Sequence, residues 1–238
     1  MTVAIIIAAG SGSRMNQDIP KQFLSVNDIP IIVYTLQGFQ RHPDVDTIEV
    51  VCLDGWHDIL WAYSKQFKIN KLKWIVSGGA TTQESIRNGV YNLENMCCEN
   101  DIIIIHDGIR PLVEEKVLSD VISKCKEHGN AVSSLPYTEQ IFIAEDEIST
   151  AKYIPREALR RVSTPQAYNY ELLLKSYKKA YKDNIGIYGS AYTNTMMVDL
   201  GEKLYFALGS EKNIKLTSSE DIEIFKALLS TQKAEWMK

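Results

Sequence analysis

The sequence predicts an α/β fold of the Rossmann-like type: a mostly parallel, twisted sheet with helices on both of its faces. Two observations predict this class. Apolar runs rich in β-branched residues alternate with stretches of helical periodicity along the chain. Runs such as Ile102–Ile105 are apolar at every position, which is typical of a strand buried on both faces. With 238 residues, 45% of them hydrophobic, the chain is long enough for one large α/β domain or two small ones.

The elements follow in chain order. The apolar runs predict strands at Val3–Ala8, Ile48–Leu53, Lys73–Val76, Asp101–Ile105, Ala131–Leu135 and Leu204–Leu208. Helical periodicity predicts helices at Ile31–Phe39, Trp56–Phe67, Thr82–Asn95, Glu114–Glu127, Tyr170–Tyr181 and Ser218–Leu229. Within residues 137–161, two short apolar runs flank the acidic turn Glu145–Glu147 and indicate a β-hairpin. An isolated hairpin is marginal in water, which favours a partner surface.

Composition narrows the possible classes of protein. The net charge of −4 argues against a general nucleic-acid binder. No apolar stretch approaches the roughly 20 residues that span a bilayer, so no membrane partner is expected. The start, Met1–Ile5, lacks the charged region and cleavage site of a signal peptide. The cysteines, Cys52, Cys97, Cys98 and Cys125, form no C-x-x-C pattern and are expected to be reduced thiols in a cytoplasmic protein.

The stretch "AAGSGSRMNQDIPKQ" begins where the first strand ends. In parallel sheets, ligands bind beyond the carboxyl ends of the strands, and a glycine loop there offers backbone N–H groups to an anion. Gly10 and Gly12 fit the first two glycines of a dinucleotide fingerprint, but Met15 stands where the third is needed. No Gly-Lys-Ser/Thr follows, so the stretch is not a Walker A loop either.

Two cations in the same stretch favour a phosphate site. Arg14 supplies a guanidinium fork and Lys21 a point charge, the usual pair for neutralising phosphate oxygens. The alternative is a tight turn between strand and helix with two solvated cations.

The second motif is "IIIIHDGIRP". A buried strand leads into Asp107, a hard oxygen ligand suited to a Mg²⁺ that also binds substrate phosphates, with Arg110 beside it. The alternative is an Asp that caps the next turn and an Arg in a surface ion pair. For His106 we expect a structural role, in which the ring orients the loop, and not a metal-binding one.

The third motif is "NIKLTSSEDIEIF". One of Thr217, Ser218 or Ser219 is expected to cap the last helix. Lys215 lies in the short apolar segment just before the cap. It is either a solvated strand residue or a further phosphate cation that points into the crevice.

Together these stretches resemble one family, the cytidylyltransferases of 2-C-methyl-D-erythritol 4-phosphate and ribitol 5-phosphate. The matching pieces occur in the family's order and run from Ile5 to about Leu229: "AAGSGSRM" with "PKQFL", "GGATTQES", "HDGIRP", "IPREALRRVSTPQAY" and "NIKLTSSEDI". The resemblance implies a single nucleotidyltransferase domain over residues 1–238, and a reaction in which CTP and a polyol phosphate give a CDP-polyol and pyrophosphate, with Mg²⁺.

The resemblance also implies roles for individual residues. The nucleotide would be held by Ala8, Ala9, Gly10, Ser11, Gly12, Gly79 and Ser85. Arg14, Lys21 and Lys215 match the catalytic cations, and Asp107 matches the Mg²⁺ ligand. The acceptor side would be formed by Arg110, Arg156, Thr164 and Thr193.

The family resemblance further implies a homodimer. The hairpin at 137–161 would be a protruding arm that embraces a second subunit, so that Arg156 completes the neighbouring site. Departures from the family pattern fall on the acceptor side, at Glu139, Gln140 and Asn194, and Thr82 replaces a usual arginine. The acceptor therefore stays open between ribitol 5-phosphate, methylerythritol phosphate and a glycerol phosphate, and with it the pathway, either isoprenoid synthesis or teichoic acid and capsule synthesis.

Two other classes stay open. One is a nucleotidyltransferase that uses another NTP and a sugar phosphate, since such enzymes share the glycine loop, Arg and Lys. The other is a non-catalytic CTP-binding homologue of the same fold.

Overall fold

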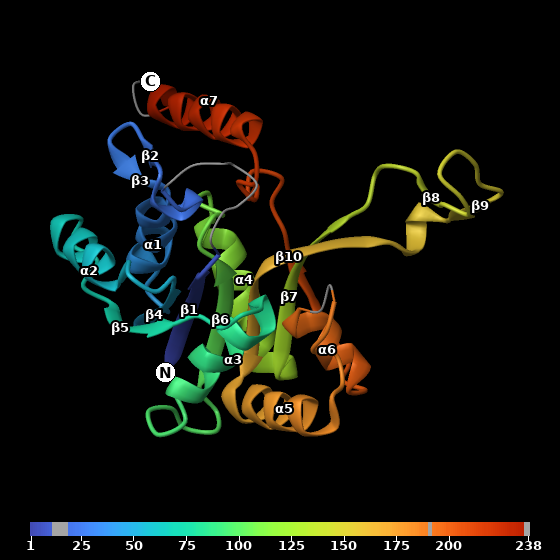
Figure 1. Cartoon of the computed structure of the whole chain (residues 1–238), viewed down its shortest axis with the longest axis horizontal. Helices are drawn as coiled ribbons and strands as arrows, with labels where there is room; N and C mark the ends of the chain where they lie inside the picture. Colours follow the sequence, from blue (N-terminus) through green and yellow to red (C-terminus); the bar gives the residue numbers. More distant parts are fainter. Residues whose placement is uncertain (11–18, 190–191, 236–238) are drawn as a thin grey trace.

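The computed structural model describes residues 1–10, 19–189 and 192–235 and shows a helix-flanked sheet from which one arm projects (Figure 1). Within this described part, seven strands form the sheet in the order β11-β7-β10-β6-β1-β4-β5. Their bounds are β1 Thr2–Ala8, β4 Thr47–Cys52, β5 Leu72–Ser77, β6 Ile102–Asp107, β7 Asn130–Pro136, β10 Arg160–Asn169 and β11 Phe206–Leu208. Strand β10 runs antiparallel to β6 and β7, and the other neighbouring pairs are parallel, which confirms the mostly parallel sheet.

Helices cover both faces of the sheet, as the alternation of side chains along β1 requires. Ala4 and Ile6 point into the core with α1 (Ile31–Arg41), α2 (His57–Gln66) and α4 (Glu115–His128). Val3 and Ile5 point into the core with α3 (Thr82–Asn92), α5 (Tyr170–Asp183) and α6 (Thr193–Asp199). Because both faces are buried, the central strands must be apolar at consecutive positions, as the sequence predicts.

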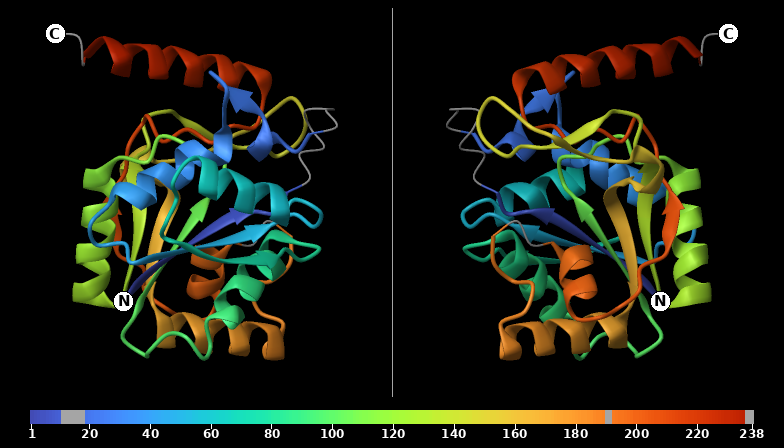
Figure 2. Two further views of the ribbon diagram at one scale, coloured as in Figure 1. Left: turned by 90° about the vertical axis from the view of Figure 1, so that its left-hand side faces the viewer. Right: turned by 90° about the vertical axis from the view of Figure 1, so that its right-hand side faces the viewer.

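Helix α7 (Ser219–Glu235) crosses the end of the molecule at which β1 and β6 finish (Figures 1 and 2). Its fully buried Phe225 packs in a small cluster with Val26, Ile31 and Leu216. Val26 belongs to a short hairpin of β2 (Ser25–Val26) and β3 (Ile29–Pro30). Helix α7 therefore covers the carboxyl edge of the sheet.

The expected hairpin is confirmed. Strands β8 (Ile141–Ile143) and β9 (Lys152–Ile154) pair antiparallel in the outer part of the arm, and the loop between them forms its tip in Figure 1. The 3-10 turn η3 (Arg156–Ala158) follows at the base of the arm. Phe142 is 57% exposed and Tyr153 67% exposed, so the arm presents large apolar side chains to solvent.

Among the strands of the seven-stranded sheet and the α-helices of the described residues, two elements were not predicted. Strand β10 was not expected, because Pro165 lies inside it and proline is rare in central strands. The pairing of β10 with β7 shifts register between Val162 and Gln166, and this irregularity accommodates the proline. Helix α6 was not predicted either; it spans only seven residues, too few for a clear helical pattern.

Candidate active site

The first and second motifs meet at the carboxyl edge of the sheet. Strands β1 and β6 pair in parallel with Ile7 opposite Asp107. The next backbone N–H, that of Gly108, donates to the carbonyl of Ile7 at 2.8 Å. The glycine loop therefore starts directly beside the aspartate, as expected for motifs that follow neighbouring parallel strands.

Asp107 is held between two cations that come from different parts of the chain. Its Oδ2 lies 2.8 Å from Arg110 Nε and 3.2 Å from Lys215 Nζ. A second guanidinium nitrogen of Arg110 donates to the carbonyl of Asn213 at 2.8 Å, which ties the loop of the third motif to that of the second. Lys215 thus points at the aspartate and is not a solvated strand residue. With side chains only 16% and 18% exposed, Arg110 and Asp107 do not form a surface ion pair either.

The electrostatics of this cluster suit an anionic ligand. Burial by itself would raise the pKa of Asp107, but the charges of Lys215 and Arg110 outweigh it and hold the pKa below its usual value. Within this cluster, one carboxylate and two cations leave a net positive charge. The cluster is therefore suited to bind phosphate oxygens.

The same carboxylate is the candidate metal ligand. The described residues contain no cluster of three or more His, Cys, Asp or Glu side chains that would form a complete metal cage. Mg²⁺ is commonly held by one or two carboxylates together with substrate phosphates and water. A single ionised aspartate beside a phosphate site fits a cation of that kind.

His106, the residue before Asp107 in β6, is completely buried. Burial lowers the pKa of this ring to about 4, so the ring is neutral at pH 7. Its Nε2 lies 3.1 Å from the carbonyl of Arg110, to which a neutral Nε2–H donates. This contact agrees with the expected structural role, because it fixes the turn that carries Arg110.

The glycine loop also meets the "GGATTQES" segment. Helix α3 starts with a capping box in which Thr81 and Glu84 bind each other's backbone N–H groups. The Ser85 hydroxyl accepts from the N–H of Gly79 at 3.0 Å and donates to the carbonyl of Thr81 at 2.9 Å. Gly78 lies so close to Ala9 that a Cβ on Gly78 would come within 2.3 Å of the Ala9 Cβ. The start of the glycine loop and the segment that carries Gly79 and Ser85 therefore lie side by side.

Sequence reasoning missed three neighbours of the predicted site residues. Gln22 donates to the carbonyls of Ala8 and Gly10, and its only signal in the sequence was its place in "PKQFL". Asn213 is 4% exposed and donates to the carbonyl of Thr164 at 2.6 Å. The ring of Tyr192 lies with its centre 5.9 Å from Lys215 Nζ. No local sequence pattern indicates Asn213 or Tyr192, because each contacts a residue that is far from it in the sequence.

The remaining predicted residues lie as follows. The Thr164 hydroxyl accepts from the N–H of Asp107 at 3.1 Å, so Thr164 belongs to the cluster. Thr193 is 1% exposed, and its hydroxyl bonds to that of Tyr177 at 2.8 Å. Arg156 lies on the arm, where it donates to the carbonyl of Thr138 at 3.0 Å. Lys21 opens the 3-10 turn η2 (Lys21–Phe23), whereas Ser11, Gly12 and Arg14 lie outside the described residues.

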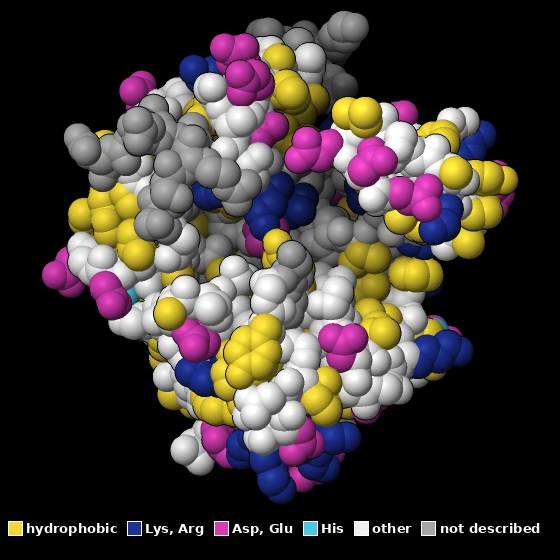
Figure 3. Space-filling view, turned by 45° about the vertical axis from the view of Figure 1, so that its right-hand side comes forward, with side chains coloured by type: hydrophobic (Ala, Val, Ile, Leu, Met, Phe, Trp, Pro, Cys, Tyr) yellow, Lys and Arg dark blue, Asp and Glu magenta, His cyan; other side chains and the backbone are white. Residues whose placement is uncertain are grey.

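A cavity of about 320 Å³ opens beside the cluster. Arg110, Lys215 and Arg161 line it together with the carboxylates Glu211 and Asp221, and Arg161 pairs with Glu211. Figure 3 shows a hollow of this kind near the middle of one face, in which Lys and Arg side chains gather. The site thus combines an open cavity, an ionised carboxylate and several cations, which together can bind and neutralise phosphorylated molecules.

Comparison with known proteins decides the family. The family model described as "IspD: 2-C-methyl-D-erythritol 4-phosphate cytidylyltransferase" matches residues 2–231. The chain belongs to this family. It is therefore a nucleotidyltransferase of the cytidylyltransferase type, and the family resemblance predicted from the motifs is confirmed.

Relatives in the IspD family carry two different names. The chain is 60% identical to a ribitol-5-phosphate cytidylyltransferase of Lacticaseibacillus paracasei, over 96% of this chain and 98% of the relative. It is 37% identical to a 2-C-methyl-D-erythritol 4-phosphate cytidylyltransferase of Clostridioides difficile, over 99% and 96%. A solved 4-diphosphocytidyl-2C-methyl-D-erythritol synthase from Anaerococcus prevotii shares the fold, with a TM-score of 0.81, 23% identity and coverage of 96% and 98%.

Proposed function

We propose that the protein transfers the cytidylyl group of CTP to ribitol 5-phosphate and releases pyrophosphate. The observation that carries the acceptor is the 60% identity to a ribitol-5-phosphate cytidylyltransferase, against 37% to a relative named for methylerythritol phosphate. The Asp107, Arg110 and Lys215 cluster supports a triphosphate substrate, because it joins a candidate metal ligand to two cations.

In the proposed reaction an oxygen of the acceptor phosphate attacks the α-phosphorus of CTP in line. The new P–O bond forms as the bond from the α-phosphorus to the bridging oxygen breaks, and pyrophosphate leaves with the electron pair. Such transfer needs little covalent chemistry from the protein, so positioning and charge neutralisation dominate. Lys215 and Arg110 would neutralise the phosphates, together with Lys21 and with Arg14 of the undescribed segment.

A divalent cation, for which we propose Mg²⁺, would be held by Asp107 and would neutralise charge on the triphosphate when bound. The residues around Asp107 keep its carboxylate ready for this role. Lys215 and Arg110 hold it ionised, and the Thr164 hydroxyl accepts from its backbone N–H. Asp107 must then share its oxygens between the ion and the two side chains that contact it here.

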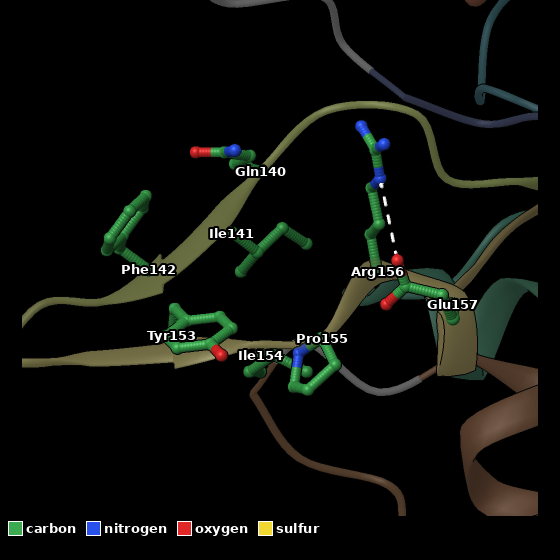
Figure 4. A pocket seen from close by; sticks show the side chains of 8 residues that line it. All are labelled: Gln140, Ile141, Phe142, Tyr153, Ile154, Pro155, Arg156 and Glu157. Carbon is green, nitrogen blue, oxygen red and sulfur yellow. Dashed lines mark ion pairs between the residues drawn. The ribbon is translucent and has the colours of Figure 1, made fainter.

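We further propose a homodimer in which Arg156 completes the neighbouring site. Arg156 begins the turn η3 at the base of the exposed arm (Figure 4), and its side chain is 55% exposed. It lines a groove of about 470 Å³ together with Phe142 and Tyr153, and Figure 4 shows the side chains that form this lining. Exposed aromatic side chains on a projecting arm favour a protein surface as the occupant. Gln140, one of the departures from the family pattern, lines the same groove.

The compartment and pathway follow from these proposals. All four cysteines are free thiols, which supports the expected cytoplasmic location. No helix within the described ranges is long and apolar enough to cross a bilayer. A CDP-ribitol product would serve the synthesis of cell-surface polymers, and a methylerythritol product would instead serve isoprenoid synthesis.

Pyrophosphate release tests the acceptor. The enzyme, CTP and Mg²⁺ are combined with ribitol 5-phosphate, methylerythritol 4-phosphate, or the 2- or 3-phosphate of glycerol. We expect the highest kcat/KM with ribitol 5-phosphate, and a higher value with another acceptor would overturn the proposal. The same assay with UTP, GTP or ATP tests the nucleotide, and CTP binding without any turnover would indicate a non-catalytic homologue. Light scattering should give twice the 27.0 kDa mass of one chain.

A further inference from the structure

The Gln22 side chain joins two segments of the site that the sequence keeps apart. Its Nε2 donates to the carbonyl of Ala8 at 2.8 Å and to the carbonyl of Gly10 at 3.0 Å. Both amide hydrogens are therefore used on the first residues of the glycine loop. Gln22 is 1% exposed, so these bonds lie where water does not compete with them.

The bonds dictate which way the loop backbone faces. In a trans peptide the carbonyl of one residue and the N–H of the next point in opposite directions. Because the Ala8 carbonyl points at Gln22, the N–H of Ala9 points away from it. The side chain of Ala9 is fixed from another direction, since Gly78 packs against it with no room for a Cβ. Backbone N–H groups are the part of such a loop that binds an anion.

Gln22 itself is placed by a rigid support. It is the middle residue of η2, between Lys21 and Phe23. The Phe23 ring stacks on Trp56 with centres 4.4 Å apart, and Phe23 is 3% exposed. The N–H of Phe23 donates to the carbonyl of Pro20 at 2.8 Å. The turn that carries the candidate catalytic Lys21 is thus anchored in the core on one side and to the glycine loop on the other.

We infer that Gln22 is a positioning residue for the nucleotide: it fixes residues 8–10, the described start of the glycine loop, and the Lys21 turn in one geometry that binds the CTP phosphates. The inference rests on the proposed function, since CTP is the ligand in question. Losing Gln22 should therefore weaken CTP binding and the use of CTP, and it should do so beyond any loss of stability.

The test compares Gln22→Glu with a matched variant at the opposite edge of the sheet. Asn130 is also a buried side-chain amide that bonds backbone groups, those of Lys203 and Tyr205, and it lies at the amino end of β7. Gln22→Glu and Asn130→Asp make the same chemical change, from amide to carboxyl. Gln22→Met is the second variant, because it keeps the unbranched shape and removes the donors.

The measurements are the Kd of CTP by calorimetry, the KM of CTP, the KM of ribitol 5-phosphate, and the melting temperature. For both Gln22 variants we expect the Kd and KM of CTP to rise about 10-fold or more, because small misplacements of a binding group have effects of that size. The acceptor KM should change less than twofold. Asn130→Asp should lower the melting temperature about as much as the Gln22 variants do, but its Kd for CTP should equal that of the wild type.

The outcomes separate the inference from the proposed function. If the Gln22 variants lose stability like Asn130→Asp but bind CTP as the wild type does, Gln22 is merely structural and the inference fails. If one Gln22 variant does not fold, the other decides by the same readouts. If the wild type itself does not bind CTP, the proposed function fails and the positioning role with it. A wild type that binds CTP but does not use ribitol 5-phosphate overturns only the proposed acceptor.

Discussion

Replacing Gly78 by alanine should impair CTP binding through a steric contact that the structure defines. The new Cβ would lie 2.3 Å from the Cβ of Ala9. Since carbon atoms pack at about 3.5 Å or more, one of the two loops must retreat by about 1.2 Å. Overpacking of this kind typically costs about 1–3 kcal/mol of stability. Because a displacement of about 1 Å can reduce activity 100-fold, we expect kcat/KM for CTP to fall roughly 10- to 100-fold.

Gly129→Ala is the matched control for Gly78→Ala. Gly129 has φ +85°, and a Cβ on it would meet nothing within 4 Å. An L residue in this conformation costs about 1–2 kcal/mol, so the control loses comparable stability without a clash. Gly129 immediately precedes β7 at the edge of the sheet opposite the site. Calorimetry with CTP and thermal denaturation of both variants decide the matter. The reasoning is refuted if Gly78→Ala binds CTP within twofold of the wild type.

Four further predictions concern single side chains. Lys215→Ala should lower kcat about 100- to 1000-fold, as loss of one group at a developing charge does, and near-normal turnover would reject its role. Asp107→Asn should raise the Mg²⁺ concentration for half-maximal activity at least about 10-fold, since even groups that only support a metal ligand have effects of that size; an unchanged metal titration would exclude it as the ligand. Arg156→Ala should raise the KM of the acceptor more than the KM of CTP. The reverse order would contradict its assignment to the acceptor side of the site. Burial raises the pKa of Glu49 to about 8, against the lowering effect of its bond to Asn92. Between about pH 4.5 and 8, Glu49 therefore keeps its proton in the folded state and loses it in the unfolded state. The free energy of unfolding then falls as the pH rises through this window, by up to about 1.4 kcal/mol per pH unit. Glu49→Gln should remove this slope in urea unfolding at pH 5 to 9, and parallel profiles of variant and wild type would contradict the assignment.

The sequence predicts the main strands and helices because their signals are local. A strand buried on both faces must be apolar at consecutive positions, and a helix that covers a sheet must repeat its apolar face every 3.6 residues. Ile102–Ile105 and the periodic stretch of α5 are examples, and both fold as expected. Strand β10 escaped because Pro165 contradicts the local rule for strands, and only the irregular pairing with β7 accommodates it.

For the site, the sequence by itself determined which residue types would follow which strands. Because parallel strands end at one edge, the glycine loop and Asp107 had to come near each other. Only the tertiary structure decided that Lys215 contacts Asp107, 108 residues away in the sequence, and that Gln22 donates to the carbonyls of Ala8 and Gly10. It also decided that Thr193 lies beneath the surface. The physical reason is that local patterns report how a segment folds, whereas the partner of a polar side chain is chosen by the packing of distant segments against one another.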